Sequence, residues 1–233
     1  MFAYLSTISL YPLWNSLRIA AIAGVLVFFA GILCAYYVAR LPRVIKGILD
    51  VILTLPMVLP PTVCGYFLLL VFGAKRPLGI FLQQFGIRFV MTWYGGVLSA
   101  FVVAFPLMYR GALGAFDNLD PNMLDAARTL GWSESRIFFQ IMLPLSWSSI
   151  AASTVLAFAR ALGEFGATLF LAGNYLGITR TIPIAIYFEW MNGNTDIAIF
   201  WTIILVIFSF IVIMFINLWS QHTTRYRKGA VEE

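Results

Sequence analysis

Long runs of apolar residues dominate the chain, and short polar segments separate them. A helix needs about 20 apolar residues to cross the hydrocarbon core of a bilayer, because each residue adds only about 1.5 Å. Runs of that length predict membrane-spanning helices at residues 16–39, 47–72, 94–116, 145–172 and 197–219. The pattern therefore predicts an all-α integral membrane protein.

Two apolar segments need a separate interpretation. The first run is too long for a cleaved signal peptide and no A-x-A site follows it, so we expect a retained span. The run "TRTIPIAIYFEWM" at 179–191 is too short to span and predicts a re-entrant or interfacial helix. Without a linker, a low-complexity stretch or an internal repeat, residues 1–233 are expected to form a single transmembrane domain.

Composition and charge agree with this class. Hydrophobic residues make up 61% of the chain and charged residues 11%, whereas a soluble domain has about a quarter charged residues. The net charge of +5 comes from basic residues spread over short loops, which indicates membrane topology and no nucleic-acid partner. Cys34, Cys64 and His222 have no ligand spacing, so we expect no metal site and no disulfide.

The basic residues also predict orientation, because cytoplasmic loops are enriched in Lys and Arg. Nine lie near the ends of the first and third spans and in the C-terminal tail, against four in the other two loops. This distribution predicts an external N-terminus and a cytoplasmic C-terminus, with the loop at about 117–143 in the cytoplasm. We expect Arg88 and Arg180, on the external side, to be solvated, with docking of an acidic binding protein as the alternative.

Two spans contain residues that a plain bundle does not need. Pro60 and Pro61 interrupt the second span together with Pro56, and such a break indicates either a packing kink or a translocation path. Arg160 and Glu164 lie four residues apart in the fourth apolar run, where we expect them to share a helix face with Thr168. Because a charge in the membrane is costly, the pair indicates a packing ion pair, a gate or a lining of the path, and less readily a direct substrate site.

The polar segment before the fourth span has helix start and stop signals. Asp120-Pro121 predicts an N-cap and a first helical turn, and Gly131 predicts the end of that helix. Ser133 then predicts the cap of a second short helix, and Pro144 the start of the next span. Apolar positions on these helices indicate either a protein partner or an amphipathic segment resting on lipid.

The same segment resembles the cytoplasmic-loop motif of ABC importer membrane subunits. That motif reads E-A-A, three residues, G, nine residues, I-x-L-P. The chain matches it everywhere except at the first position, where aspartate replaces glutamate; the matching residues are Asp125, Ala126, Ala127, Gly131, Ile141, Leu143 and Pro144. The resemblance implies about five to six transmembrane helices of the type I ABC importer permease fold, with the loop at about 117–143 as a coupling helix that docks on an ATPase.

Further segments resemble molybdate permeases in particular: "LPMVLPPTVCGYFLLLVFG" (55–73), "LAFARALGEFGATLFLAGN" (156–174) and "TRTIPIAIY" (179–187). Sulfate/thiosulfate permeases share the second segment, usually with tyrosine and serine where Phe165 and Ala167 stand. The resemblance thus favours molybdate, or tungstate, over sulfate as the substrate.

The resemblance implies a homodimer of permease copies in the cytoplasmic membrane, two cytoplasmic ATPase subunits and an external molybdate-binding protein. Without a G-x-x-x-x-G-K-[ST] loop the chain itself is not expected to be an enzyme or to hold a cofactor, and ATP and Mg²⁺ belong to the partner ATPase. The alternatives are a sulfate permease, an ion-driven secondary transporter or a non-transporting anchor. A secondary transporter predicts broken helices in both halves, whereas only the first half is interrupted by prolines.

Overall fold

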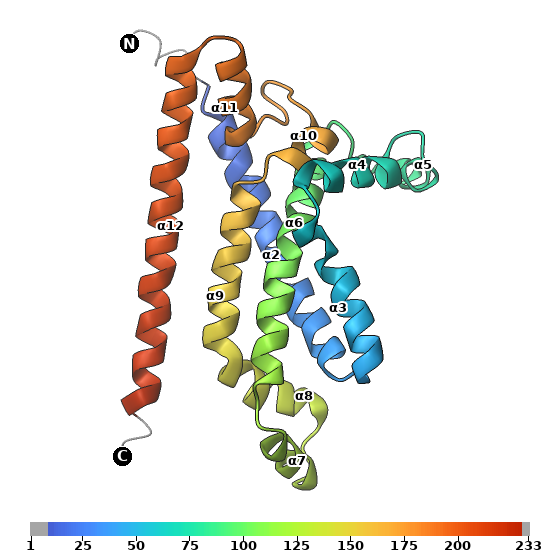
Figure 1. The fold of residues 1–233 in the computed structure, drawn as a ribbon, viewed down its shortest axis with the longest axis vertical. Helices are drawn as coiled ribbons and strands as arrows, with labels where there is room; N and C mark the ends of the chain where they lie inside the picture. The colour runs from blue at the N-terminus through green and yellow to red at the C-terminus, as the bar shows by residue number, and fades with distance from the viewer. Residues whose placement is uncertain (1–8, 230–233) are drawn as a thin grey trace.

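The computed structural model describes residues 9–229, with side chains over residues 9–214. Within that range the structure is helical and contains no strand. Three helices form the core of a bundle: α2 (Tyr11–Ala39), α6 (Trp93–Asp117) and α9 (Leu143–Leu162), with α12 (Thr195–Gly229) alongside (Figure 1).

Small residues let the core helices approach closely, as is common in membranes where van der Waals packing replaces hydrophobic association. A Cβ on Gly31 of α2 would lie 2.6 Å from the Met108 Cγ of α6. A Cβ on Gly111 of α6 would lie 2.5 Å from the Cβ of Ser153 on α9. The α2–α6–α9 contacts therefore leave no room for a larger side chain at these two glycines.

The second predicted span is broken. α3 (Arg43–Val58) and α4 (Pro61–Phe72) meet at an angle of 113°, and α5 (Pro77–Gln84) follows α4 away from the bundle (Figure 1). The cause lies in the consecutive prolines, because Pro60 and Pro61 cannot donate a hydrogen bond to the carbonyls of Pro56 and Met57 four residues earlier. The Cys64 Sγ–H makes a weak hydrogen bond of 3.7 Å to the Pro56 carbonyl, and the Pro60 carbonyl accepts from the N–H of Val63 at 2.9 Å.

The fourth predicted span, 145–172, is wrong at both ends. One apolar helix of 29 residues runs from Glu134 to Leu162 and includes the turn before Pro144, which therefore does not start the span. The helix ends at Gly163, and α10 (Gly166–Ala172) is a separate short helix. Both halves of the chain thus contain a broken element, so proline content alone underestimated the breaks.

The short apolar run after α10 forms α11 (Ile182–Met191), which confirms a helix too short to span. The segment before it is fixed to the start of α2, since the Ser16 hydroxyl accepts from the N–H of Ile182 at 2.8 Å. The expectation that Arg180 is solvated is wrong. It is 8% exposed and forms an ion pair of 2.6 Å with Glu189.

In the part of the chain that the structure describes, the number of membrane crossings is four, or five if the bent α3–α4 pair is counted as one span. Four helices are long and apolar enough to span a membrane, and the bent α3–α4 pair brings the number to five within the described residues. The expectation of five to six spanning helices is thus confirmed at its lower value. The start of α2 and the helices α10 and α11 lie at one end of the bundle, and the loop between α6 and α9 and the last turns of α12 lie at the other, here called the loop end (Figure 1).

Candidate coupling loop and translocation path

The polar loop consists of α7 (Pro121–Thr129) and α8 (Glu134–Ile137), which project from the loop end of the bundle (Figure 1). Asp120 caps α7 as predicted, since its Oδ1 accepts from the N–H of Asn122 at 2.9 Å. Gly131 adopts φ +79°, a left-handed conformation that ends α7 and reverses the chain. Ser133 then caps α8 by accepting from the N–H of Arg136 at 3.3 Å. The predicted start and stop signals at Asp120, Gly131 and Ser133 are confirmed.

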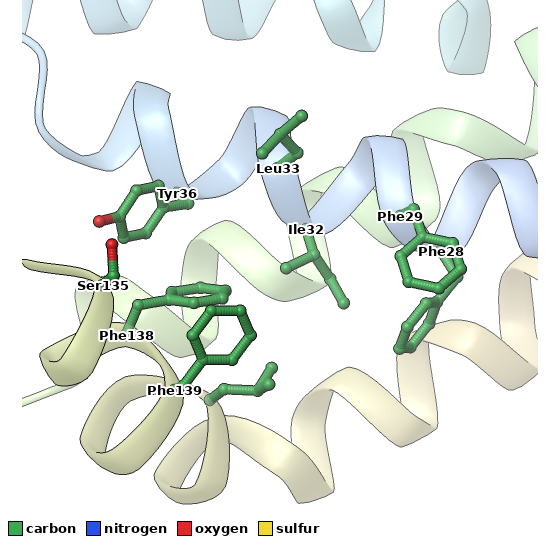
Figure 2. A pocket seen from close by; sticks show the side chains of 9 residues that line it. Phe28, Phe29, Ile32, Leu33, Tyr36, Ser135, Phe138 and Phe139 are labelled. Atoms are coloured by element: carbon green, nitrogen blue, oxygen red, sulfur yellow. The ribbon is translucent and has the colours of Figure 1, made fainter.

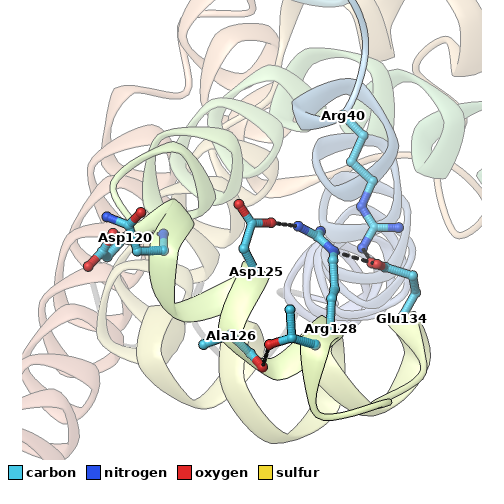
Figure 3. Close-up of polar contacts among 8 residues, drawn as sticks. Arg40, Asp120, Asp125, Ala126, Arg128 and Glu134 are labelled. Carbon is cyan, nitrogen blue, oxygen red and sulfur yellow. Dashed lines mark hydrogen bonds and ion pairs between the residues drawn. The ribbon is translucent and has the colours of Figure 1, made fainter.

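Ion pairs hold the loop in one shape and tie it to the bundle (Figure 3). Arg128 contacts Asp125 at 2.5 Å and Glu134 at 2.8 Å, and Glu134 also pairs with Arg40 at the end of α2. The hydrogen bonds from Arg128 to Glu134 and then Asp125 raise the pKa of its guanidinium above the ordinary value. The aspartate that opens the sequence motif therefore lies in a chain of charges that runs from α7 through α8 to α2.

The loop presents a different surface from the one expected. Two apolar residues of α7 face inward: Ala127 is buried and Leu124 packs against the core of the bundle. The outer surface carries Asp125, Ala126 and Leu130, of which Leu130 is 76% exposed. Helix α7 therefore does not present an apolar face to lipid. Its charged surface, with one exposed leucine, suits a protein partner.

A π-helical turn, η1 (Phe138–Met142), joins α8 to α9, and it was not foreseen from the sequence. The N–H of Leu143 donates to the carbonyl of Phe138, five residues earlier. Pro144 follows at once and cannot donate to the carbonyl of Gln140, so the wider turn accommodates a proline within a continuous helix. Ile141 and Leu143 of the motif are half-buried, and Pro144 is exposed.

A cavity of about 370 Å³ lies between α2 and the π turn (Figure 2). Its walls are apolar, and Tyr36 and Ser135 lie at its loop end. The residues that line it are Phe28, Phe29, Ile32, Leu33, Tyr36, Ser135, Phe138, Phe139 and Leu143. Sequence reasoning missed this cavity because its two walls are about a hundred residues apart in sequence.

The charged pair of the fourth apolar run forms, but not on one helix face. Arg160 lies on α9 and Glu164 in the break that follows, where their side chains form an ion pair of 2.7 Å. The Glu164 carboxylate, which is 3% exposed, also accepts from the backbone N–H of Ala167 at 2.7 Å. Glu164 therefore stabilises the start of α10 as well as neutralising Arg160. Thr168 is buried in α10 and does not continue an α9 face.

The two breaks lie against each other at the end of the bundle opposite the loop. A Cβ on Gly166, which begins α10, would lie 3.1 Å from the Cβ of Pro61, which begins α4. A Cβ on Gly65 would lie 2.7 Å from the Cα of Ala167. Pro60, Pro61 and Glu164, far apart in sequence, therefore belong to one region where short helices meet.

The described residues contain no group of three or more His, Cys, Asp or Glu side chains able to hold a metal ion. Cys34 and Cys64 are free thiols. The described residues form a helical bundle. Its two helix breaks, between α3 and α4 and between α9 and α10, lie at one end, and the charged loop lies at the other.

Comparison with known proteins identifies this arrangement. Residues 27–225 match the family described as "Binding-protein-dependent transport system inner membrane component". The chain belongs to this family. It is a multi-pass protein of the inner membrane, and the family consists of inner-membrane components of transport systems.

Individual relatives show which transport permeases of this family the chain is similar to. The molybdenum transport system permease protein of Escherichia coli (strain K12) is 45% identical over 181 residues, which are 76% of this chain and 79% of that protein. The corresponding protein of Haemophilus influenzae is 46% identical over 157 residues, covering 67% and 69%. A Bacillus subtilis permease assigned provisionally to molybdenum transport is 39% identical over 212 residues, covering 91% and 93%. The resemblance to molybdate permeases seen in the sequence is thus confirmed.

Solved structures confirm the fold. A bacterial ABC transporter that imports the acidic polysaccharide alginate aligns with a TM-score of 0.79 at 17% identity, covering 95% of this chain and 82% of that one. The inward-facing MetNI methionine ABC transporter aligns with a TM-score of 0.69 at 13% identity, covering 91% and 94%. The type I ABC importer permease fold expected from the loop motif is therefore observed.

Proposed function

We propose that the chain is the membrane subunit of an ABC importer that carries molybdate, or the similar oxyanion tungstate, across the cytoplasmic membrane. The observation that carries the proposal is the identity of 45% with a molybdenum transport permease over most of both chains. Membership of the binding-protein-dependent family supports an external binding protein as donor of the substrate. Sulfate is the competing substrate, since sulfate permeases share part of the sequence pattern.

The loop end of the bundle lies in the cytoplasm in this proposal, with the N-terminus outside. Two copies of the chain form the path, and each docks α7 on one of two ATPase subunits. ATP and Mg²⁺ bind the ATPase, and the chain itself holds no cofactor. The docking surface comprises Asp125, Ala126 and Leu130, whose exposure leaves them free for a partner.

The helix geometry supports transmission of motion from that surface. The ion pairs through Arg128 and Glu134 fix α7 to the start of the helix Glu134–Leu162, which runs without a break for 29 residues. At about 1.5 Å per residue this helix is about 40 Å long, enough to reach from the loop to the other membrane surface. Its far end is the Gly163–Phe165 break beside Pro61. A displacement of the loop therefore reaches the region where α4 and α10 meet.

That region supplies the candidate gate of the path. Pro60 and Pro61 leave backbone carbonyls without their helical donors, a condition that membranes allow only beside protein or a water-filled path. Arg160 is about one-third exposed and is neutralised by Glu164. We assign these residues, with Thr168, to gating of the path rather than to tight substrate binding, because tight binding would oppose release.

Reconstitution tests the proposal directly. The chain, its ATPase and the binding protein are placed in proteoliposomes, and uptake of labelled molybdate is measured with ATP. An ATPase variant unable to hydrolyse ATP is the matched control. ATP-dependent uptake that excess tungstate suppresses and excess sulfate leaves within two-fold supports the proposal. If excess unlabelled sulfate suppresses uptake as strongly as excess unlabelled molybdate does, the chain is a sulfate permease. Uptake in the absence of ATP would rule out the ABC mechanism.

A further inference from the structure

Helix α3 is attached to the bundle differently from α2 and α6. All of its residues are described, and none of them is fully buried, whereas α2 and α6 each bury a continuous face. Its apolar contact with the core comes from the half-buried Leu49 and Leu53. Apolar packing therefore contributes less to holding α3 in place than it does for its neighbours.

Two ion pairs join α3 to α6. Lys46 Nζ lies 2.6 Å from Asp117 Oδ1, and Arg110 Nη2 lies 2.7 Å from Asp50 Oδ2. Lys46 and Asp50 are one turn apart on α3, so both pairs lie along the same contact with α6. We call these four residues the α3–α6 latch. Ion pairs that are partly exposed contribute weakly and break readily, which suits a contact that must be reversible.

The same contact contains polar atoms that the observed packing does not satisfy. Asp50 Oδ1 and the Tyr109 hydroxyl oxygen are buried close together at this contact, but no hydrogen bond of normal geometry forms to either atom among the described residues. Buried polar atoms are usually paired, because leaving one unpaired is costly. The contact between α3 and α6 is therefore not optimised for permanent closure.

The other end of α3 is a hinge. Leu59 is extended at ψ 140° and Pro60 at ψ 137°, so the helix is interrupted there. Beyond the hinge, α4 is held by the close approach of Gly65 to Ala167 on α10. One side of the hinge is thus fixed by close packing, and the other is held by the latch.

We propose that α3 is a moving wall of the translocation path, pivoting at Leu59–Pro60. The latch residues are positioning residues for transport: they hold α3 against α6 in one state of the cycle and release it in the other. This inference rests on the proposed function, because it needs an alternating path. It goes beyond that proposal by naming the element that moves and the side chains that restrain it.

A reversible cross-link tests the movement. The chain has two cysteines, and C34A/C64S removes both thiols while the serine keeps a donor for the Pro56 carbonyl. In this background K46C/D117C is joined by a short, reducible thiol-to-thiol reagent. We expect ATP-driven molybdate uptake to fall at least ten-fold and to return when the cross-link is reduced. Recovery on reduction shows that the protein remained folded.

The control variant is R18C/W93C, which ties α2 to α6 away from the latch, where the Arg18 guanidinium carbon lies 3.9 Å from the centre of the Trp93 ring. Uptake within two-fold of the uncross-linked protein is expected for this control. Normal uptake by the cross-linked latch variant would overturn the inference, and so would an equal loss in the control.

Cross-linking yield separates this inference from the choice of substrate. We expect the yield of K46C/D117C to differ at least three-fold between the nucleotide-free and vanadate-trapped complexes, measured without molybdate. If the C34A/C64S protein, which keeps all four latch residues, fails to take up molybdate, the proposed substrate is wrong, and the yields of K46C/D117C still report whether α3 moves. Equal yields in the two states would overturn the moving wall whatever the substrate is.

Charge exchange tests the latch itself. D50N and R110Q are each expected to lower uptake three- to ten-fold, because each leaves one charge without its partner. The exchange D50R/R110D restores opposite charges and is expected to return uptake to within two-fold of the original. An exchange variant that assembles normally with the ATPase but transports no better than the single variants would overturn the electrostatic role.

Discussion

Replacement of Gly131 tests whether the shape of the loop is needed for coupling. Its φ of +79° lies in the left-handed region, and a Cβ added there would meet nothing within 4 Å. Any effect of alanine must therefore come from the backbone rather than from a clash, and the left-handed conformation costs an L-residue about 1–2 kcal/mol. Asparagine tolerates that conformation better than alanine does.

Proline has a larger effect for two reasons. It fixes φ near −65°, which is incompatible with the observed turn, and it removes the N–H that donates to the Arg128 carbonyl at 2.9 Å. We expect a cost of about 3 kcal/mol or more for the folded loop. Because each 1.4 kcal/mol is a factor of ten, this would reduce the docking-competent fraction by more than about a hundred-fold if the full cost falls on the loop.

The assay compares uptake of labelled molybdate, ATP hydrolysis and membrane insertion for the three variants. G131N is expected to transport nearly as well as the original, G131A several-fold less at limiting ATPase concentration, and G131P not measurably, with all three inserted equally. Normal coupled uptake by G131P would refute the reasoning. Equal losses for G131N and G131P would refute the backbone argument while leaving the importance of the glycine intact.

Three further predictions concern packing, the charged break and the helix cap. G111A should destabilise the detergent-solubilised protein by about 1–3 kcal/mol because its Cβ would crowd Ser153, and S153G should restore the melting temperature in the double variant; failure of that rescue would place the strain elsewhere. E164Q should lower uptake at least ten-fold, since Arg160 loses its counter-charge, while the conservative E164D should retain more activity; similar uptake by the two variants would argue against the ion pair. D120A should cost about 1 kcal/mol of α7 stability, seen as faster amide exchange confined to residues 121–129, and unchanged exchange would contradict the capping role.

The local signals of the loop were predictable from sequence because each depends on a residue and its immediate neighbours. Asp120 and Ser133 cap helices through their own side chains, and Gly131 is favoured where φ is positive. The spans at α2, α6 and α12 followed from apolar length, which reflects the thickness of the bilayer. These features required no knowledge of long-range packing.

The break after α9 could not be predicted in the same way. Residues 145–172 are apolar enough to continue as one helix. The interruption after Gly163 is stabilised by a hydrogen bond that the Glu164 carboxylate accepts from the N–H of Ala167. This break packs against Pro61, which is about a hundred residues away in sequence. The burial of Arg180 likewise depends on Glu189 and on the fold that surrounds the pair. Interactions of this kind are set by tertiary packing, and a hydropathy pattern does not encode them.

The sequence predicted the place of the loop helices better than the surface that they expose. A helix with apolar spacing was expected to expose that face, but Ala127 is buried against the protein's own core. The exposed residue Leu130 follows the helix and has no periodic signal. The docking surface in the proposed function is therefore a result of the structure, whereas its place in the chain came from the sequence.

The central claim is that this loop contacts an ATPase in the cytoplasm, and a photo-cross-linking amino acid at Leu130 tests it most directly. The exposed side chain at this position allows the replacement without loss of packing. Illumination of intact cells that express the whole transporter is predicted to give an adduct of the chain with its ATPase subunit, and a probe at the exposed Trp190, near the opposite end of the bundle, should give none. An adduct of the Leu130 probe with the external binding protein, or with lipid alone, would contradict the account.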